Sequence, residues 1–516
     1  ADQWPEPVAT GAYRTFLGTG VPTWAIQGTG ERSPYVRNDV MTIGVVTAVF
    51  PDLGGFWLQG DGDGDPATSD GVFVLVGEDA EMPVTAGDWV QVNGRVRELS
   101  GQTTLDMSDV TLLNSDIPLP APIPFDPPAD AAAALVYMES LEGMLVTLPD
   151  TAVAIAPTTR YGEYTLALAK WGVDHVARTD DAGYLIYVDD GSTMSHDDQT
   201  TLAYTVTGGD LVSNLTGPLA FTFGNYKIEP LAPPEIVAGE RPLPTLPDLA
   251  PNQFSIATFN VENFFDLVDP HPSSPPRPSL EEYRAKLDKV AAAIVAMGAP
   301  TIVGVQEVEN IGILQDLVEL EPLAAYGYLP LLVEGDDSRG IDVGFLVRGD
   351  QAVVDGFASY PAPGELFSRP PLLITATVTL PAGEQTVYVI NNHFLSLSGG
   401  EAATEPIRNA QAAWNAELVA GILARDPEAQ VIVLGDLNSF YDTLPIHTLQ
   451  AAGLRHVYEF FGVYDPLPYT YIFEGRTQTL DHMLVSEGLF GRVTAVTPLK
   501  IDADYPIPDP ADASPR

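Results

Sequence analysis

The spacing of apolar runs changes near residue 252, and this change limits what the chain can fold into. Between residues 40 and 231 the runs are short, and Gly, Asp and Pro interrupt them at close intervals, as in "GFWLQG" and "GVFVLVG". Such spacing is typical of small all-β barrels and sandwiches. From residue 252, strand-like runs alternate with longer helical stretches, which we expect over 280–297 and 405–424. This alternation predicts a layered α/β domain.

Two proline-rich stretches, at 118–129 and 231–251, divide the chain into modules and are predicted to be linkers. A five-stranded barrel of the oligonucleotide/oligosaccharide-binding (OB) type fits the short runs of the first module. A weak echo of its Gly-Asp pattern favours a second OB-like domain. The expected bounds are 1–35 for an irregular N-terminal segment, 36–117 for the first β domain, 118–235 for the second, 236–251 for a linker and 252–516 for the α/β domain.

The chain is strongly acidic, with 70 Asp and Glu against 24 Lys and Arg and a net charge of −46. A nucleic-acid-binding protein usually carries a basic surface, and this composition supplies none overall. Any anionic substrate must therefore be held by backbone dipoles, by a few arginines or by divalent cations. The chain has no cysteine, which excludes disulfides, thiolate chemistry and cysteine-ligated zinc. It has no apolar run of about 18 residues, so we expect no membrane span.

Several polar residues end or interrupt apolar strands in the C-terminal half. They are Asn260, Glu307, Asp342, His393, Asp436, Asn438 and Asp481. Carboxylate and amide oxygens suit a hard cation such as Mg²⁺ or Ca²⁺, and a histidine beside a carboxylate can act as a general acid or base. Together they predict hydrolysis of a phosphate ester, in which a metal neutralises phosphate charge and the histidine handles a proton.

The motifs "NVENFFD", "QEVEN", "NHF" and "GDLNS" occur in this order. With them the C-terminal half resembles the endonuclease/exonuclease/phosphatase superfamily, the metal-dependent fold that includes pancreatic-type deoxyribonuclease. Segments such as "GDGDGDPATSDGVFV" are similar to the leading β domains of bacterial extracellular nucleases. The resemblance implies a four-layer α/β sandwich and a secreted, metal-dependent phosphodiesterase that hydrolyses DNA or RNA. It also implies Mg²⁺ or Mn²⁺ as cofactor, with Ca²⁺ as an alternative.

The resemblance assigns roles to individual residues. Glu307 would be the principal metal ligand, with Asn260 beside it. His393 would be the general acid that protonates the leaving oxygen, and Asp342 is our candidate for the carboxylate that orients it.

The remaining strand-end residues would act on water and phosphate. Asp436 would activate or orient water, Asn438 would bind phosphate, and Asp481 would orient a second histidine. Arg339 and Arg408 are candidates for phosphate contacts, with ordinary surface arginines as the alternative reading.

Two features have a plain structural alternative. Asp61, Asp63 and Asp65 alternate in a pattern that resembles the start of a calcium loop. The bidentate glutamate of such a loop is lacking and a proline follows, which favours a solvated acidic turn. His482 follows Asp481, but alternation along a strand places it on the opposite face, and we interpret it as structural.

Two further functions stay open. The same fold could act on a phosphoester other than a nucleic acid, and the net charge of −46 favours this because it repels polyanions. Alternatively, the chain is a binding protein whose catalytic domain is degenerate.

The C-terminal stretch departs from the superfamily pattern. Members carry a final Ser-Asp-His motif that leads into one last strand. After "LDHMLVS" the chain goes on to "TPLKIDADYPIPDPADASPR", which holds no such motif. We therefore expect the chain as written to lack its last strand and a catalytic histidine, and to have low activity.

Overall fold

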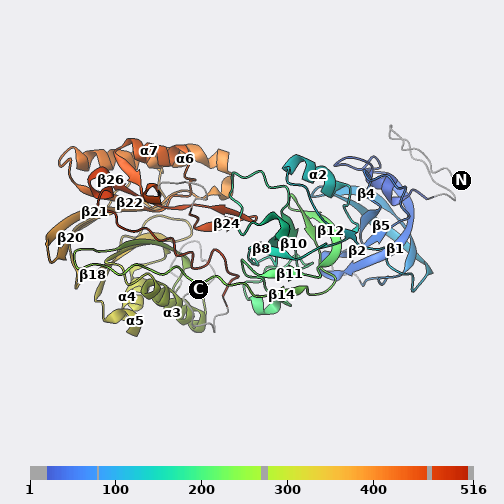
Figure 1. The fold of residues 1–516 in the computed structure, drawn as a ribbon, viewed down its shortest axis with the longest axis horizontal. Coiled ribbons are helices and arrows are strands. Elements are labelled where there is room, and N and C mark those ends of the chain that lie inside the picture. The colour runs from blue at the N-terminus through green and yellow to red at the C-terminus, as the bar shows by residue number, and fades with distance from the viewer. Residues whose placement is uncertain (1–19, 78–80, 269–276, 462–467, 509–516) are drawn as a thin grey trace. The chain divides into compact units, whose positions relative to one another are not determined.

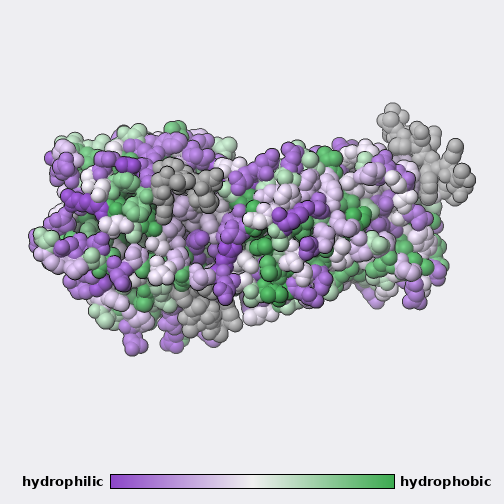
Figure 2. Space-filling model, in the orientation of Figure 1, coloured by the Kyte–Doolittle hydropathy of each residue, from purple (hydrophilic) through white to green (hydrophobic). Residues whose placement is uncertain are grey.

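The computed structural model describes residues 20–77, 81–268, 277–461 and 468–508 (Figure 1). The chain divides into two compact units. Unit 1 comprises Ala1–Arg241, Phe473–Arg476 and Asp504–Asp509, and unit 2 comprises Pro242–Ile472, Thr477–Ala503 and Pro510–Arg516. Among the described helices, none is long and apolar enough to cross a membrane. Hydrophilic residues cover much of the face shown in Figure 2, in line with the acidic composition.

Unit 1 begins with a closed barrel of five strands, in the order β1-β2-β3-β5-β4. β3 pairs with β5 in parallel, and the other pairs are antiparallel. Val90, Val92 and Val96 of β4 are buried in the barrel core, as the period of two along a strand requires. The strands are β1 (Asp39–Phe50), β2 (Gly55–Gln59), β3 (Gly71–Leu75), β4 (Trp89–Leu99) and β5 (Gln102–Asn114).

The described part of segment 1–35, which was predicted to be irregular, contains one short helix. Thr23–Gln27 form the short helix α1. Val21, Ile26 and Tyr35 are buried in the barrel core. A helix of little more than one turn is too short to show a periodic apolar pattern, so no sequence signal indicated it.

The rest of unit 1 is a nine-stranded sheet, in the order β14-β11-β8-β9-β10-β13-β12-β7-β6, with the helix α2 (Ala131–Glu139). It is not the second closed barrel that was predicted. Most of its strands are three to five residues long. The strands are β6 (Ile123–Pro124), β7 (Leu145–Thr147), β8 (Ala152–Ala156), β9 (Tyr164–Leu168), β10 (Ile186–Val188), β11 (Leu211–Ser213), β12 (Thr216–Thr222), β13 (Asn225–Ile228) and β14 (Glu235–Val237).

The proline-rich stretch 118–129, predicted to be a linker, is part of this sheet. Its residues Ile123–Pro124 form β6, which pairs in parallel with β7. Phe125 is 1% exposed and packs in the core of the sheet. β6 is the outermost strand, where a proline without an N–H group is tolerated.

Unit 2 contains two sheets that share one apolar cluster. Phe345 of the first sheet and Ile374 and Leu434 of the second are buried in it. The four-stranded sheet has the order β15-β16-β18-β17, and the six-stranded sheet has the order β19-β20-β21-β22-β26-β23. The strands, with the separate pair β24–β25, are β15 (Ile256–Phe264), β16 (Ile302–Val308), β17 (Tyr328–Leu332), β18 (Asp342–Arg348), β19 (Ala352–Ser359), β20 (Leu372–Leu380), β21 (Gly383–His393), β22 (Gln430–Asp436), β23 (Leu454–His456), β24 (Tyr471–Phe473), β25 (Arg476–Gln478) and β26 (Asp481–Ser486).

Helices cover the outer face of each sheet in unit 2 (Figure 1). α3, α4 and α5 pack on the four-stranded sheet in a cluster that includes Leu287 and Val305. α6 and α7 pack on the six-stranded sheet in a cluster that includes Val419 and Val433. The helices are α3 (Leu280–Ala296), α4 (Ile311–Glu319), α5 (Glu321–Ala324), α6 (Glu401–Leu423), α7 (Leu444–Ala451) and α8 (Glu487–Phe490).

Glu142 is a buried acid where the barrel meets the nine-stranded sheet of unit 1. Its Oε1 accepts from the backbone N of Thr103 at 2.9 Å and from Nε2 of Gln27 at 3.3 Å, and the residue is 2% exposed. Burial, with a smaller contribution from Glu139, raises the pKa of Glu142 from 4.5 to about 8. Because the pKa of Glu142 is higher in the folded state, ionising this residue costs more there than in the unfolded state. Glu142 therefore lowers the stability of unit 1 as pH rises from 4.5 to about 8.

Replacing Glu142 with Gln keeps an acceptor for Thr103 and removes the titrating proton. We expect E142Q to stabilise unit 1 by roughly 2–4 kcal/mol at about pH 8, and to have little effect at about pH 4, where the carboxyl is already protonated. Urea unfolding of both proteins across this pH range measures the difference. E235Q, at an exposed position on β14, is the control. An E142Q effect that is the same at both pH values would contradict the assignment.

Candidate active site

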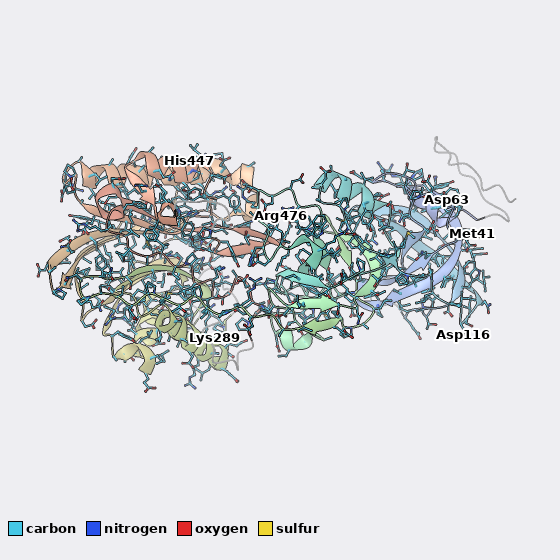
Figure 3. All side chains as sticks on the ribbon, in the orientation of Figure 1. Met41, Asp63, Asp116, Lys289, His447 and Arg476 are labelled. Carbon is cyan, nitrogen blue, oxygen red and sulfur yellow. The ribbon has the colours of Figure 1, made fainter. Side chains whose placement is uncertain are left out.

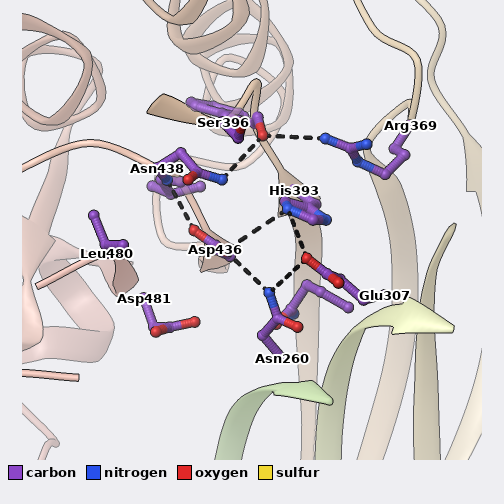
Figure 4. A network of polar contacts seen from close by, with 12 residues as sticks. Asn260, Glu307, Arg369, His393, Ser396, Asp436, Asn438, Leu480 and Asp481 are labelled. Atoms are coloured by element: carbon purple, nitrogen blue, oxygen red, sulfur yellow. Dashed lines mark hydrogen bonds and ion pairs between the residues drawn. The ribbon is translucent and has the colours of Figure 1, made fainter. Parts of the chain in front are cut away.

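Parallel strand pairs carry the predicted site residues to one place (Figure 4). β15 and β16 run parallel, and their register brings Asn260 level with the residue before Glu307. β21 and β22 also run parallel and pair His393 with Asp436, which lies opposite Asp481 of antiparallel β26. Since the carboxyl ends of parallel strands meet at one edge of a sheet, residues far apart in sequence come together there.

A buried polar tie joins the two sheets. Gln306 Nε2 donates to Asn391 Oδ1 at 2.7 Å, and Asn391 Nδ2 donates to the carbonyls of Val305 and Gly344 at 2.9 and 2.8 Å. Gln306 and Asn391 are both 0% exposed. Gln306 directly precedes Glu307, and Asn391 lies two residues before His393. The tie therefore fixes these two strand ends relative to each other. The sequence analysis did not single out either residue.

Glu307 leaves the regular ladder of β16. Its φ is +66°, and the pairing of β16 with β18 shifts register between Gln306 and Val308. A glutamate in this left-handed region costs roughly 1–3 kcal/mol, and such strain is found at functional sites. Glu307 Oε2 accepts from the backbone N of Asn263 at 2.8 Å. The bulge therefore holds one carboxylate oxygen and turns the other toward the site.

Asn260 joins two carboxylates. Its Nδ2 donates to Glu307 Oε1 at 3.3 Å and to Asp436 Oδ2 at 3.0 Å. Its Oδ1 accepts from the backbone N of Glu262 at 2.9 Å. The amide oxygen of Asn260 accepts from the backbone, and its amide nitrogen donates to the two carboxylates. That Asn260 is itself a metal ligand stays a prediction.

His393 is buried against the same carboxylates. Its Nε2 lies 3.6 Å from Glu307 Oε1 and 3.7 Å from Asp436 Oδ2. Burial, followed by the guanidinium groups of Arg369 and Arg339, lowers the pKa of His393 well below its usual value. The ring is therefore neutral. A neutral imidazole can accept a proton, whereas the predicted general acid would first have to be protonated.

Asp342 does not orient His393, contrary to the prediction. Its Oδ1 accepts from the backbone N of Gly335 at 2.9 Å, and burial raises its pKa to about 7. Within the described ranges, Nδ1 of His393 has no hydrogen-bond partner. Asp342 is the first residue of β18, and its carboxyl closes the loop that leads into this strand.

The turn after β22 places Asn438 against the end of β21. Asn438 has a φ of +44°, and its backbone N donates to Asp436 Oδ1 at 2.9 Å. Its Nδ2 donates to the carbonyl of Phe394 at 3.2 Å. The "GDLN" segment is thus a turn closed by its own aspartate, and it also carries Asp436 into the site.

Asp436, Asp481 and Glu307 concentrate negative charge in a buried place. Burial raises the pKa of Asp436, and the charges of Asp481 and Glu307 raise it further. Burial likewise raises the pKa of Asp481, with Glu307 adding to the shift. Among the described residues, Oδ1 of Asp481 has no hydrogen-bond partner. Buried carboxylates without enough donors need a positive partner.

The two predicted phosphate-binding arginines have different places. Arg339 reaches the site, since its Nη2 lies 3.9 Å from Glu307 Oε1 and its Nη1 donates to Asn263 Oδ1 at 3.4 Å. Arg408 is 2% exposed and donates within α6, to Thr404 Oγ1 and to the carbonyl of Glu401. The prediction for Arg408 is therefore wrong, because its guanidinium is used to stabilise the start of its own helix.

Sequence reasoning missed Arg369, which lies at the site. Its Nη1 pairs with Asp337, and both side chains are 5% exposed. Its Nη2 donates to the carbonyl of Phe394 at 3.3 Å, the same oxygen that accepts from Asn438. Arg369 stands outside any strand, in "FSRPPL". A single arginine in a proline-rich loop gave no specific signal.

Lys286 of α3 was also missed. Its Nζ donates to the carbonyl of Glu262 and to that of Asn263, at 3.5 Å for the latter. These two residues have φ values of +48° and +44°. Lys286 therefore holds the irregular end of β15 from which Asn260 and Asn263 contact the carboxylates.

The turn that carries Asp61, Asp63 and Asp65 is exposed in unit 1. Asp63 Oδ1 accepts from the backbone N of Asp65 at 2.8 Å and from Thr68 Oγ1 at 3.1 Å, and Asp65 Oδ1 accepts from the backbone N of Ala67 at 3.0 Å. In the part of the chain that the structure describes, no three His, Cys, Asp or Glu are grouped to hold a metal. These carboxylates stabilise a turn, which fits the solvated acidic turn that the sequence favours over a calcium loop.

The described residues of the candidate active site also form no such group of three. This limits the kind of cation that would fit the site. Its donors suit an ion that takes one or two carboxylates and completes its shell with water and phosphate, as Mg²⁺ does. Glu307 Oε1 and Asp436 Oδ2 are two carboxylate oxygens of this kind, and both accept from the Asn260 amide. A cavity of about 1100 Å³ in unit 2 is lined in part by Asn260, Thr470 and Asp481, so the site borders on open space.

Removing Asp337 would leave Arg369 buried without its partner. We expect D337A to destabilise unit 2 by about 3–5 kcal/mol. The matched control is D350A, which removes the aspartate from the Arg348–Asp350 pair at 2.7 Å, where Asp350 is 49% exposed. For that pair we expect a loss below about 1 kcal/mol. Urea unfolding measures both, and equal losses would contradict the interpretation.

Two segments of the chain match different family models. Residues 255–500 match the family model described as Endonuclease/Exonuclease/phosphatase family. Residues 121–238 match a domain of unknown function (DUF8508). No curated protein sequence matches the chain.

Three similar solved structures each cover less than half of the chain. An endonuclease/exonuclease/phosphatase family protein from Bacteroides thetaiotaomicron is 18% identical over 45% of this chain and 82% of that chain, with a TM-score of 0.33. Truncated TDP2 from Caenorhabditis elegans is 18% identical over 45% and 84%, with a TM-score of 0.32. A mannosyl-6-phosphatase from Bacteroides thetaiotaomicron is 17% identical over 46% and 86%, with a TM-score of 0.32. The residues that match the endonuclease/exonuclease/phosphatase family model, 255–500, are also those that carry the candidate active site.

Proposed function

We propose that the chain is a secreted, metal-dependent phosphodiesterase, and specifically a nuclease that hydrolyses DNA or RNA. The observation that carries this proposal is the meeting of His393 with Glu307 and Asp436, at 3.6 and 3.7 Å. An imidazole beside two carboxylates suits proton transfer during attack of water on phosphate. The family match over 255–500 supports the same class of reaction.

Enzymes of this family generally use divalent metals such as Mg²⁺. In this chain Glu307 would hold the ion, with Asp436 beside it. The ion, when bound, would neutralise the charge of the phosphate. We propose Mg²⁺ or Mn²⁺, with Ca²⁺ as an alternative, because the excess of buried carboxylates calls for a hard cation.

The side chains of the site would divide the remaining work. His393 is neutral and faces both carboxylates with Nε2, so it would accept a proton there. Asp436 would orient the attacking water. Asn438 would bind the phosphate, and Arg339, whose side chain is 45% exposed beside Glu307, would contact it from the solvent side.

The finer architecture is part of the proposal. The strand order β1-β2-β3-β5-β4, with its one parallel pair, supports an OB-type barrel. The packing of helices on the outer faces of two sheets supports a four-layer sandwich for unit 2.

The net charge favours a second candidate function. At −46 the chain as a whole repels polyanions. A small phosphoester would not meet this repulsion to the same degree. The same site would then act on a non-nucleic-acid substrate.

Substituting Glu307 with Gln tests the metal-dependent mechanism. We expect E307Q to lower turnover of bis(p-nitrophenyl) phosphate, with Mg²⁺ or Mn²⁺, by about 100-fold or more, because it removes the charge that would hold the ion. It should also weaken Mn²⁺ binding in calorimetry. E319Q, at an exposed position on α4, should change neither measurement.

The substrate class follows from parallel assays. Nicking of plasmid DNA or cleavage of RNA by the wild type, abolished by a chelator, would support the nuclease. Hydrolysis of small phosphoesters alone would favour the second candidate. Full activity in the chelator would overturn the metal-dependent mechanism.

A further inference from the structure

His456 and His482 form a chain of hydrogen bonds behind the candidate active site. His482 Nε2 lies 2.7 Å from the carbonyl oxygen of Ser439, and its Nδ1 lies 2.9 Å from His456 Nε2. His456 Nδ1 accepts from the backbone N of Tyr458 at 3.1 Å. Every ring nitrogen of the pair therefore takes part in a hydrogen bond.

The partners fix where the protons are. The carbonyl of Ser439 can only accept, so His482 carries its proton on Nε2. The amide of Tyr458 can only donate, so His456 also carries its proton on Nε2 and donates it to His482 Nδ1. Each ring holds one proton and is neutral, and burial lowers the pKa of both. Aligned hydrogen bonds of this kind polarise and strengthen one another in a buried place.

The position of His482 explains what the chain of bonds holds. In the pairing of β26 with β22, Asp481 lies opposite Asp436. Successive side chains of a strand point to opposite faces, so Asp481 points to the site and His482 points away from it. On that face His482 donates to Ser439, the residue directly after Asn438. The site turn is thus supported from behind.

Other bonds hold the supported turn as well, among them the bond from the backbone N of Leu437 to the carbonyl of Leu480 at 2.9 Å. Asn438 has a φ of +44° and is held by Asp436 and by the carbonyl of Phe394. Further along the turn, Tyr441 packs edge-on against His456, with ring centroids 4.9 Å apart and planes at 75°. The histidine pair therefore contacts the turn at two points.

We propose that His482 and His456 are positioning residues of the reaction. They hold the carbonyl of Ser439 and thereby place Asn438 against the phosphate. This inference rests on the proposed function, in which Asn438 binds phosphate. Neither imidazole hydrogen-bonds to the carboxylate cluster, since the bonds described above already use all four ring nitrogens.

The test compares two substitutions of His482 in the full chain. H482F removes both hydrogen bonds and keeps an aromatic ring, whereas H482Q keeps one donor and one acceptor. With bis(p-nitrophenyl) phosphate, we expect H482F to lower kcat by about 10- to 100-fold and H482Q to stay within about 3-fold of the wild type, because small misplacements near a reacting group are costly. H447Q, at an exposed histidine on α7 (Figure 3), should not change kcat.

The second histidine extends the test. We expect H456F to lower kcat in the same direction, and to add little when combined with H482F, because the two residues act through one chain of bonds. Melting temperatures of all variants identify any change that comes from unfolding. Additive effects of the two substitutions would contradict the shared role.

Backbone hydrogen exchange of residues 437–441 gives a readout that needs no substrate. We expect exchange there to rise in H482F and H456F and to stay as in the wild type in H482Q and H447Q. If the wild type hydrolyses no phosphodiester, the proposed function fails, and exchange alone decides whether the pair holds the turn. Wild-type kcat and exchange in folded H482F would overturn the inference. If H482F and H456F both fail to fold while H482Q behaves as the wild type, the histidine pair serves folding alone. That result would also overturn the inference.

Discussion

Negative charge buried at the strand ends is the constraint on which unit 2 depends. Asp436 and Asp481 lose most of their hydration beside Glu307, the charges of Asp481 and Glu307 raise the pKa of Asp436, and the charge of Glu307 raises the pKa of Asp481. The surrounding chain meets this cost with donors: the Asn260 amide and the backbone N of Asn263 both point at the carboxylates. Such donors reduce the excess of charge without cancelling it, which leaves room for a divalent cation.

This arrangement requires two sheets at a fixed separation. Glu307 belongs to the four-stranded sheet and Asp436 to the six-stranded sheet, and an apolar cluster shared by both sheets keeps them together. The buried bonds from Gln306 to Asn391, and from Asn391 to the opposite strand carbonyls, add direction that apolar packing lacks. A polar network of this kind specifies one alignment when every member is satisfied.

The sequence predicted the strand-end residues well for a physical reason. A charged residue that closes an apolar strand is expensive to bury, so its presence is informative, and parallel pairing brings such ends together. Asp342 followed the same pattern and yet only closes a loop, because the sequence does not reveal which backbone donors a carboxylate will meet. Arg408, which was expected at the phosphate, donates within its own helix instead, and Arg369, which was not expected at the site, lies there because of the path of its loop.

The β half shows where sequence reasoning is limited by long-range pairing. Five short runs separated by Gly and Asp predicted the first barrel's strands, and these close as a barrel. Similar runs in the second module form a nine-stranded sheet, into which the proline-rich stretch 118–129 contributes β6. Closure depends on strand length and stagger rather than on the local pattern.

The left-handed backbone of Glu307 has a consequence for how this protein would respond to selection in the laboratory. Glycine adopts a φ of +66° without strain. A change to glycine there would relieve the backbone and remove a buried charge, against a backbone entropy cost of roughly 0.5–1 kcal/mol. Such a variant would also lose the bonds from Asn260 and from the backbone N of Asn263, so the relief of strain and the lost bonds act on stability in opposite directions. A library sorted for yield, solubility or heat resistance would therefore select only weakly against it, and only a count of product molecules would reveal the loss.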